Sequence, residues 1–257
     1  FGGLRIERDG EPLHLPTQKA RDLLGYLIAF RDRPHPRTAL VGVLWPDLPE
    51  DKARRRLSNT LWRLRHVLGD YVLADERYVW LNDARPCRLD VAQFEATLSQ
   101  ESAPPAIAPL EAALALYHGP FLNGRYHDWA LLERERLRGL YLEGLGRLLQ
   151  HHKQVGAYAQ ALNVARRLIA VEPLHEAAHR ELMRLYHLLG RDAEAIAQYH
   201  HCREILQEEL SVAPAPETEV LYQVLNRRPA APANHKADSH LPTSARSPTP
   251  KLDELPL

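Results

Sequence analysis

The chain has 257 residues, which is long enough for one large domain or two domains of ordinary size. Its 33 Lys and Arg residues balance 33 Asp and Glu residues, which argues against a histone-like polycation. The hydrophobic fraction of 45% excludes wholesale disorder, and two cysteines cannot build a disulfide framework or a cysteine-based zinc site. No apolar run has the length of a membrane span and no signal peptide precedes the first charges, so we expect a cytoplasmic protein without a membrane partner. Because the first residue is Phe1 rather than Met, the chain is expected to be part of a longer protein.

The N-terminal residues predict a hairpin followed by a helix. Residues 4–7 and 12–15 alternate between apolar and polar side chains on either side of Gly10, which is typical of a hairpin. Thr17 is a suitable N-cap for the apolar-periodic run that follows it. This first helix is expected to end before Pro34, because proline interrupts helical hydrogen bonding.

Two more helices and a second hairpin complete the first region, which we expect to span residues 1–88. Residues 38–45 predict a short helix, and residues 50–68 predict a longer one that stops at a glycine. Residues 71–73 and 78–81 have the β-propensity of paired strands. This order of elements is that of a winged helix-turn-helix.

The third helix carries a run of basic residues without an acidic one. The six are Lys52, Arg54, Arg55, Arg56, Arg63 and Arg65. At about 100° per residue, the apolar side chains of the helix form one stripe that must face the core. The stripe consists of Ala53, Leu57, Leu61, Leu64 and Leu68. The basic residues, with Asn59 and His66, therefore fall on the opposite side and its flanks.

A helix face rich in arginine and asparagine has the chemistry needed to read a major groove. Arginine can bond a guanine edge with two hydrogen bonds, asparagine can do so with adenine, and other cations meet phosphates. Charge runs usually indicate only a solvated face, but here the acids that normally alternate with the bases are missing. The candidates for base contacts are Arg55, Asn59, Trp62 and Arg63. The candidates for phosphate contacts are Lys52, Arg54, Arg56, Arg65 and His66.

Residues 4–82 resemble the OmpR-type winged helix of SARP-type bacterial transcriptional activators. The matching motifs are Lys19-Ala-Arg-Asp-Leu-Leu, Leu44-Trp45-Pro46, Arg55-Arg-Leu-Ser-Asn59 and Leu61-Trp-Arg-Leu-Arg65. The resemblance implies that the third helix is the recognition helix and that the second hairpin is a wing near the minor groove. It makes Arg77, at the hairpin tip, the candidate wing contact.

The second region, residues 89–226, is helical and contains a repeat. Gly156 and Gly190 are 34 residues apart, and so are Ala161 and Ala195, which is the period of tetratricopeptide repeats. We expect two copies, at residues 142–175 and 176–209. Further helices are expected at residues 90–101, 107–118, 128–141 and 216–226. The fold class is thus mainly α with small β: a winged helix followed by an all-α, tetratricopeptide-like domain. A Pro-rich end, residues 227–257, predicts a disordered tail or linker.

The helical region resembles the bacterial transcriptional activator domain that follows the winged helix in SARP-type regulators. The matching segments are Leu89-Asp90-Val91, Phe94-Glu95, Leu116-Tyr-His-Gly-Pro-Phe-Leu122, Glu172-Pro-Leu-His-Glu176 and Gly190-Arg-Asp-Ala-Glu-Ala-Ile196. The resemblance implies that this region serves dimerisation and regulatory contacts.

A histidine motif and the two cysteines are the other features that could indicate enzymatic chemistry. His175-Glu-Ala-Ala-His179 matches the zinc-protease motif H-E-x-x-H, but Leu182 and Leu185 stand where an extended motif needs glycine and a third histidine. Cys87 and Cys202 lack a local catalytic context and are expected to be small packing residues. We therefore expect no enzyme, no cofactor and no metal.

The sequence favours a DNA-binding transcriptional regulator, most consistent with an activator. Its expected partners are double-stranded DNA with repeated promoter sites, RNA polymerase, and a second copy of the chain on DNA, which would place it at the nucleoid. One alternative is a repeat scaffold that binds proteins and carries a degenerate winged helix, and another is a zinc hydrolase.

Overall fold

A computed structural model describes residues 1–99 and 107–227. The contacts divide the chain into two compact units, Phe1–Leu148 and Leu149–Leu257, and each unit is described by itself. The first unit therefore extends beyond residue 88 and includes helices of the second predicted region. The predicted tail lies outside the described residues apart from Arg227. None of the helices in the described ranges is long and apolar enough to cross a membrane.

The chain begins with the predicted hairpin, although its strands are short. β1 (Glu7–Arg8) pairs with β2 (Glu11–Pro12), so the pairing covers only the residues next to the turn rather than all of residues 4–7 and 12–15. Asp9 and Gly10 both have positive φ angles, 55° and 85°. This conformation matches the twist of a tight hairpin, and Asp-Gly is a favoured pair for it.

Helix α1 (Gln18–Ala29) starts where the sequence predicts. The hydroxyl oxygen of Thr17 accepts a hydrogen bond from the amide of Ala20 at 3.2 Å, which satisfies one of the free amides of the first turn. Helix α2 (Arg37–Leu44) is followed directly by Trp45-Pro46. Lys19 Nζ, from α1, donates to the carbonyl of Leu44 at 2.7 Å and lies 5.8 Å from the Trp45 ring. Two motifs that are far apart in the sequence thus meet at the end of α2.

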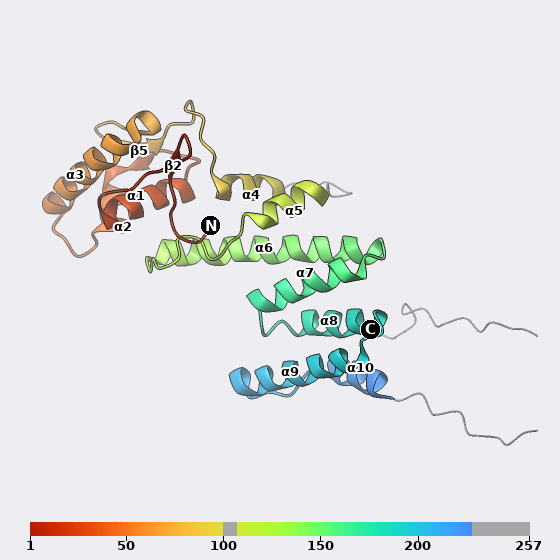
Figure 1. Ribbon diagram of the computed structural model, residues 1–257. Helices are drawn as coiled ribbons and strands as arrows, with labels where there is room; N and C mark the ends of the chain where they lie inside the picture. The colour runs from red at the N-terminus through yellow and green to blue at the C-terminus, as the bar shows by residue number, and fades with distance from the viewer. Residues whose placement is uncertain (100–106, 228–257) are drawn as a thin grey trace, which may run out of the picture. The chain divides into compact units, whose positions relative to one another are not determined.

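Helix α3 (Glu50–Leu68) has the predicted bounds and is followed by a 3-10 turn, η1 (Gly69–Tyr71). Strands β4 (Val72–Ala74) and β5 (Tyr78–Leu81) form the second hairpin. β5 also pairs with β3 (His35–Pro36), a strand that the sequence did not indicate, so the sheet order is β3-β5-β4. The three helices and this small sheet gather into a winged helix-turn-helix (Figure 1).

The core of the winged helix consists of leucines from all three helices, and their side chains point toward one another. The innermost are Leu23, Leu27, Leu40, Leu44, Leu57 and Leu64, each at most 1% exposed. Burying each of them contributes roughly 1.5–3 kcal/mol. This burial fixes the rotation of α3 about its own axis and determines which of its side chains face the solvent.

Helices α4 (Asp90–Leu98), α5 (Ile107–Ala115) and most of α6 (Asp128–Gln154) belong to the same unit as the winged helix. α4 and α5 are shorter than predicted, and α6 is one continuous helix, so the predicted break between residues 141 and 142 is wrong.

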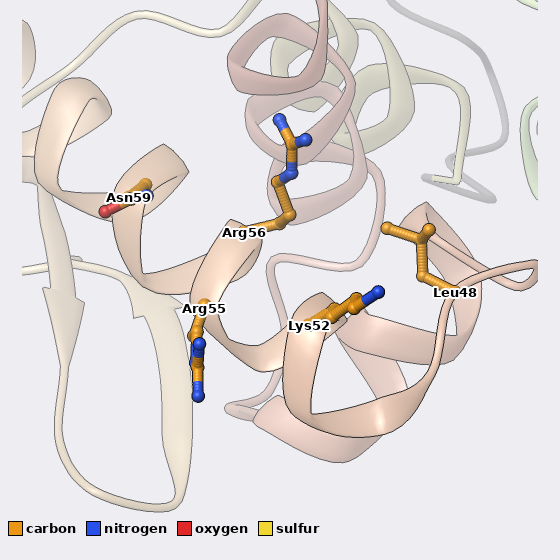
Figure 2. Close-up of a pocket in the computed structure, with 5 residues that line it drawn as sticks. All are labelled: Leu48, Lys52, Arg55, Arg56 and Asn59. Atoms are coloured by element: carbon orange, nitrogen blue, oxygen red, sulfur yellow. The ribbon is translucent and has the colours of Figure 1, made fainter.

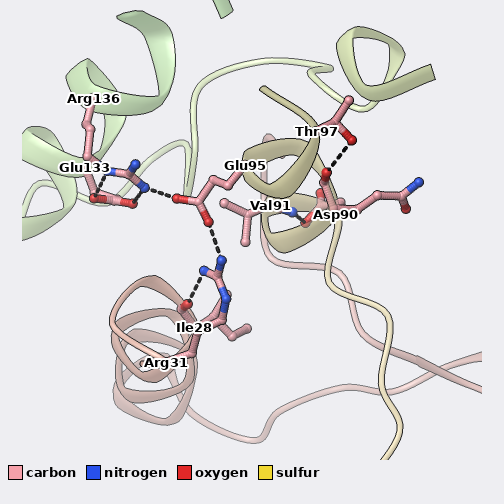
Figure 3. A network of polar contacts seen from close by, with 9 residues as sticks. Ile28, Arg31, Asp90, Val91, Glu95, Thr97, Glu133 and Arg136 are labelled. Atoms are coloured by element: carbon pink, nitrogen blue, oxygen red, sulfur yellow. Dashed lines mark hydrogen bonds and ion pairs between the residues drawn. The ribbon is translucent and has the colours of Figure 1, made fainter. Parts of the chain in front are cut away.

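A chain of ionic contacts joins α1 to α4 and α6 (Figure 3). The guanidinium of Arg31, just after α1, pairs with Glu95 of α4, and the other oxygen of Glu95 pairs with Arg136 of α6. Arg136 in turn pairs with the buried Glu133 at 2.6 Å. A second link places the 4%-exposed carboxylate of Asp22, in α1, 3.2 Å from the His127 ring. The winged helix and helices α4 and α6 therefore share polar contacts in which the carboxylates are largely buried.

The second unit contains the predicted repeat. The end of α6 and α7 (Tyr158–Val171) form the first helix pair, α8 (Glu176–Leu188) and α9 (Asp192–Leu210) form the second, and α10 (Pro216–Asn226) follows. Figure 1 shows α7, α8 and α9 stacked in chain order, and α10 contacts both α9 and α8.

The residues that define the repeat have equivalent structural roles in both copies. Gly156 and Gly190 have φ angles of 72° and 71° at the two turns, a conformation that favours glycine. Ala161 and Ala195 are fully buried, where a small side chain allows neighbouring helices to approach closely.

Candidate nucleic-acid interface

Helix α3 divides cleanly into a buried and an exposed face. Every residue of the predicted apolar stripe is at most 7% exposed, and Thr60 joins that face. Glu50 and Asp51 occupy the first turn, and Arg65 and His66 the last turn, which is the favourable arrangement for the helix dipole. The helix is thus held by its apolar face and its dipole, while its basic side chains take no part in the core.

All nine candidate contact residues on α3 are exposed to solvent. They are Lys52, Arg54, Arg55, Arg56, Asn59, Trp62, Arg63, Arg65 and His66. Trp62 is the extreme case, since 68% of this large aromatic residue is exposed. From Lys52 to His66 the exposed surface of the helix offers hydrogen-bond donors and an aromatic face, and its carboxylates, Glu50 and Asp51, lie in the first turn before them.

Most of the cations on this face have no ionic partner within the described part of the chain. Arg54 pairs with Glu50 one turn earlier, whereas no salt bridge is found for the other five basic residues among the described residues. Lys52 and Arg56 stand four residues apart on the same side, and like charges at that spacing cost a few tenths of a kcal/mol. The pair of Lys52 and Arg56 therefore slightly destabilises the fold, so fold stability does not account for these two cations.

The first half of α3 borders an open surface depression (Figure 2). Its lining consists of Leu48, Lys52, Arg55, Arg56 and Asn59. Figure 2 shows the side chains of Arg55 and Arg56 pointing in different directions, with Asn59 one turn beyond Arg55. Three cations and an amide group are thereby presented around one hollow.

The second half of α3 borders another open depression, which lies next to the hairpin β4–β5. It is lined on one side by Trp62, Arg65 and His66, and elsewhere by Arg37 from α2 and Ala74 from β4. The rings of Trp62 and His66 are stacked, with centroids 5.5 Å apart and planes 16° apart. Arg54 and Arg63 line neither depression, so the structure separates them from the two groups of candidates.

The hairpin presents Arg77 at its exposed tip, as predicted. Asp75 lies beside it, and its carboxylate accepts hydrogen bonds from the amides of Arg77 and Tyr78 at 2.7 and 2.6 Å. These two bonds are the main reason why the pKa of Asp75 lies below its ordinary value. The carboxylate of Asp75 is therefore occupied with shaping the turn, whereas Glu76, directly before Arg77, is exposed.

Arg37 is the residue of this region that the sequence reasoning missed. It reaches the hairpin from the start of α2, and its contacts come from tertiary structure rather than from any periodic pattern around it. A basic residue next to a Pro-containing break was the only signal in the sequence.

The second histidine of the H-E-x-x-H motif is a buried structural residue. His179 is fully buried, its Nε2 lies 2.8 Å from the carbonyl of Pro173, and its Nδ1 lies 2.6 Å from Nε2 of Gln198. A carbonyl can only accept, so Nε2 carries the proton and Nδ1 accepts from the amide of Gln198. Burial is the main cause that lowers the pKa of His179 and keeps its ring neutral.

The other two polar residues of the motif also have structural partners. Nδ1 of His175 accepts from the amide of Ala178 at 3.0 Å and thereby caps α8. Glu176 accepts from the amide of Ala215 at 2.7 Å and from the hydroxyl of Thr218, which ties α8 to the start of α10. The three polar residues of the motif thus make five hydrogen bonds, three of which join α8 to α9 and to the start of α10.

The two cysteines differ in environment. Cys202 is buried as predicted, and burial raises the pKa of its thiol to about 11, so the thiol stays protonated. Cys87 is exposed, and the prediction that it packs in the core is wrong. It lies in the connection between β5 and α4, where no neighbouring element covers it.

Comparison with known proteins gives one family match and several relatives. The family model described as bacterial transcriptional activator domain matches residues 83–226. The regulatory protein AfsR of Streptomyces coelicolor is 30% identical over 90% of this chain and 24% of its own length. The transcriptional regulatory protein MoaR1 of Mycobacterium bovis is 29% identical over 89% of this chain and 78% of its own length. The chain thus spans about a quarter of AfsR and more than three quarters of MoaR1.

Comparison with solved structures shows a similar fold in a mycobacterial protein. The structure is that of Mycobacterium tuberculosis EmbR in complex with a low-affinity phosphopeptide, with a TM-score of 0.68 and 23% sequence identity over 87% of this chain and 63% of that chain. At this level of identity the similarity establishes the fold, a winged helix with a helical domain.

Proposed function

Because the chain belongs to the bacterial transcriptional activator domain family and is a SARP-type transcriptional regulator, we propose that it binds specific sequences of double-stranded DNA through α3. Proteins of this family are regulators rather than enzymes. The binding mode, the residue roles and the partners below are part of the proposal.

The exposed basic face of α3 is the observation that carries the proposal. Five cations there make no salt bridge among the described residues, and the acidic residues of the helix, Glu50 and Asp51, both lie in its first turn. DNA phosphates would supply the missing negative charges, and the helix has the diameter that a major groove accepts.

Two groups of residues on this face would have different tasks. Arg55 and Asn59 are suited to bond base edges, with Trp62 and Arg63 further along the helix as additional base contacts. Lys52, Arg56 and Arg65, together with Arg54 and His66, would hold phosphates and set the register of the helix in the groove. The hairpin would act as the wing, with Arg77 near the minor groove.

The helical region would supply contacts between protein chains. A single winged helix buries too little surface for strong specificity, so a homodimer on repeated half-sites is expected. Activation of transcription further requires contact with RNA polymerase, and an action on promoters would place the protein at the nucleoid in the cytoplasm.

The salt dependence of DNA binding tests the proposal. If the four Lys and Arg candidates for phosphate contacts, Lys52, Arg54, Arg56 and Arg65, neutralise four phosphates, log Kd should change with log salt concentration at a slope of about 3.6 per protomer, and between about 3 and 6 for a smaller or larger set. Binding to a duplex that does not weaken with salt would rule out the basic face as the interface.

Two variants separate the proposed roles. Arg55→Ala should relax the base preference at one position, while Lys52→Ala should weaken binding to all sequences alike. If the two variants change specificity in the same way, the assignment of bases to one and phosphates to the other is wrong. Capture of a protein partner without measurable DNA binding would instead favour the scaffold alternative.

A further inference from the structure

The wing is held in place by a strand and a residue that lie outside the hairpin. β3, directly before α2, pairs with β5 through His35–Val79 and Pro36–Tyr78. The strand that leads away from the hairpin tip is therefore hydrogen-bonded on both of its edges, to β4 and to β3. Such a three-stranded arrangement limits how far the hairpin can swing, because bending it would break ladder bonds.

Arg37 binds both ends of the hairpin tip. Its backbone amide donates to the carbonyl of Arg77 at 2.8 Å, and its side-chain Nε donates to the carbonyl of Asp75, also at 2.8 Å. Arg37 is the first residue of α2, so these bonds join the tip to the helix-turn-helix itself. Its side chain also lines the depression beside Trp62 and His66 of α3.

Asp75 completes the fixation from inside the turn. One carboxylate oxygen accepts from the amides of Arg77 and Tyr78, and it is also near enough to Arg37 for attraction between the charges. Arg77 makes no salt bridge among the described residues, and its side chain is exposed. Hydrogen bonds within the tip thus occupy Oδ1 of Asp75 and Nε of Arg37, and the guanidinium of Arg77 stays available for a contact outside the chain.

We propose that Arg37 and Asp75 are positioning residues, which fix the hairpin tip so that Arg77 is presented to the DNA next to the half-site read by α3. This inference rests on the proposed function, since it assumes that α3 and the wing bind the same duplex. It predicts that the contribution of Arg77 to affinity depends on Arg37, even though the two side chains have separate tasks.

A double-mutant cycle on the full chain tests the coupling. With a duplex that carries the selected site, Arg77→Ala should weaken binding about ten-fold, in the range for loss of one hydrogen bond to a charged group. Arg37→Ala should weaken it by a similar factor, and the double variant should be no more than about two-fold weaker than either single variant. Arg5→Ala, which removes one exposed charge outside the sheet, serves as the control for net charge and should change affinity less than two-fold.

Substitutions of Asp75 give an independent readout that separates position from charge. Asp75→Asn keeps an oxygen acceptor and removes a negative charge near DNA, so its affinity should equal or exceed that of the unmodified chain. Asp75→Ala removes the same charge together with the acceptor, and it should bind several-fold more weakly than Asp75→Asn. Tryptophan fluorescence, to which Trp80 in β5 contributes together with the other three tryptophans, verifies that the first unit is folded in each variant.

The outcomes separate this inference from the proposed function. Additive effects of Arg37→Ala and Arg77→Ala, reaching about a hundred-fold together, would overturn the positioning role and make Arg37 an independent contact. An unchanged affinity of Arg77→Ala alongside a weakened Arg55→Ala would refute the wing inference and leave DNA recognition by α3 standing. Absence of binding by the unmodified chain would refute the proposed function and this inference with it.

Discussion

Removing the charge of Glu95 should loosen the first unit measurably. The side chain of Glu95 is 14% exposed and pairs with both Arg31 and Arg136, which are 29% and 48% exposed. Breaking a fully buried ion pair by removing one partner costs about 3–5 kcal/mol, whereas an exposed pair contributes about 0–1 kcal/mol. Because Arg31 keeps its bond to the carbonyl of Ile28 and Arg136 keeps Glu133, we expect Glu95→Gln to cost about 1–2 kcal/mol.

Urea unfolding followed by tryptophan fluorescence isolates this effect. All four tryptophans lie in the first compact unit, so their signal reports on that unit even if the two units unfold separately. With a slope of about 2 kcal/mol per molar urea, Glu95→Gln should lower the midpoint by about 0.5–1 M. The matched control is Glu135→Gln on α6, where a 71%-exposed carboxylate lies 3.4 Å from Arg138 and contributes under about 0.5 kcal/mol. Equal midpoints for the two variants would show that the contacts of Glu95 do not hold the winged helix to α4 and α6.

Four further variants test other parts of the structure. The pKa of His179 is lowered in the folded chain, so the second unit should lose stability as pH falls below about 6.5. His179→Gln should reduce that loss when unfolding is followed by circular dichroism at pH 7.5 and 5.5. A loss of the same size in the variant would contradict the buried neutral ring. Within α6, a Cβ at Gly139 would meet open space, so Gly139→Ala should stabilise the first unit by up to about 1 kcal/mol. A Cβ at Gly144 would lie 2.6 and 2.9 Å from two buried leucine side chains, so Gly144→Ala should cost about 1–2 kcal/mol. A gain in stability at both positions would refute that packing. Arg56→Gln should leave the urea midpoint unchanged or raise it slightly and should lower the salt slope of DNA binding by about 0.9, and an unchanged slope would remove Arg56 from the phosphate contacts.

The sequence predicted best where the physical signal is local and periodic. α3 has the predicted bounds because its apolar stripe repeats at helical spacing and a proline and a glycine flank it. The turns at Gly156 and Gly190 were predictable because a fixed period marks equivalent positions in both repeats. The candidate face of α3 followed directly, since burying one side of a helix exposes the other.

The remaining features depend on contacts between distant residues, which no local pattern encodes. β3 has only two residues and includes a proline, so its strand character comes from pairing with β5. The continuity of α6 was missed because a repeat period fixes equivalent positions but not the residue at which a helix begins. The roles of Glu95 and Arg37 likewise became visible only once other elements had been placed beside them.

Selection of bound duplexes from random double-stranded DNA, with the complete chain, tests the central claim most directly. If α3 reads base edges and the protein acts as a dimer, the bound pool should converge on a short motif that recurs at a fixed spacing, and Arg55→Ala should blur one position of that motif. Recovery of duplexes without any enriched motif would contradict sequence-specific recognition by α3.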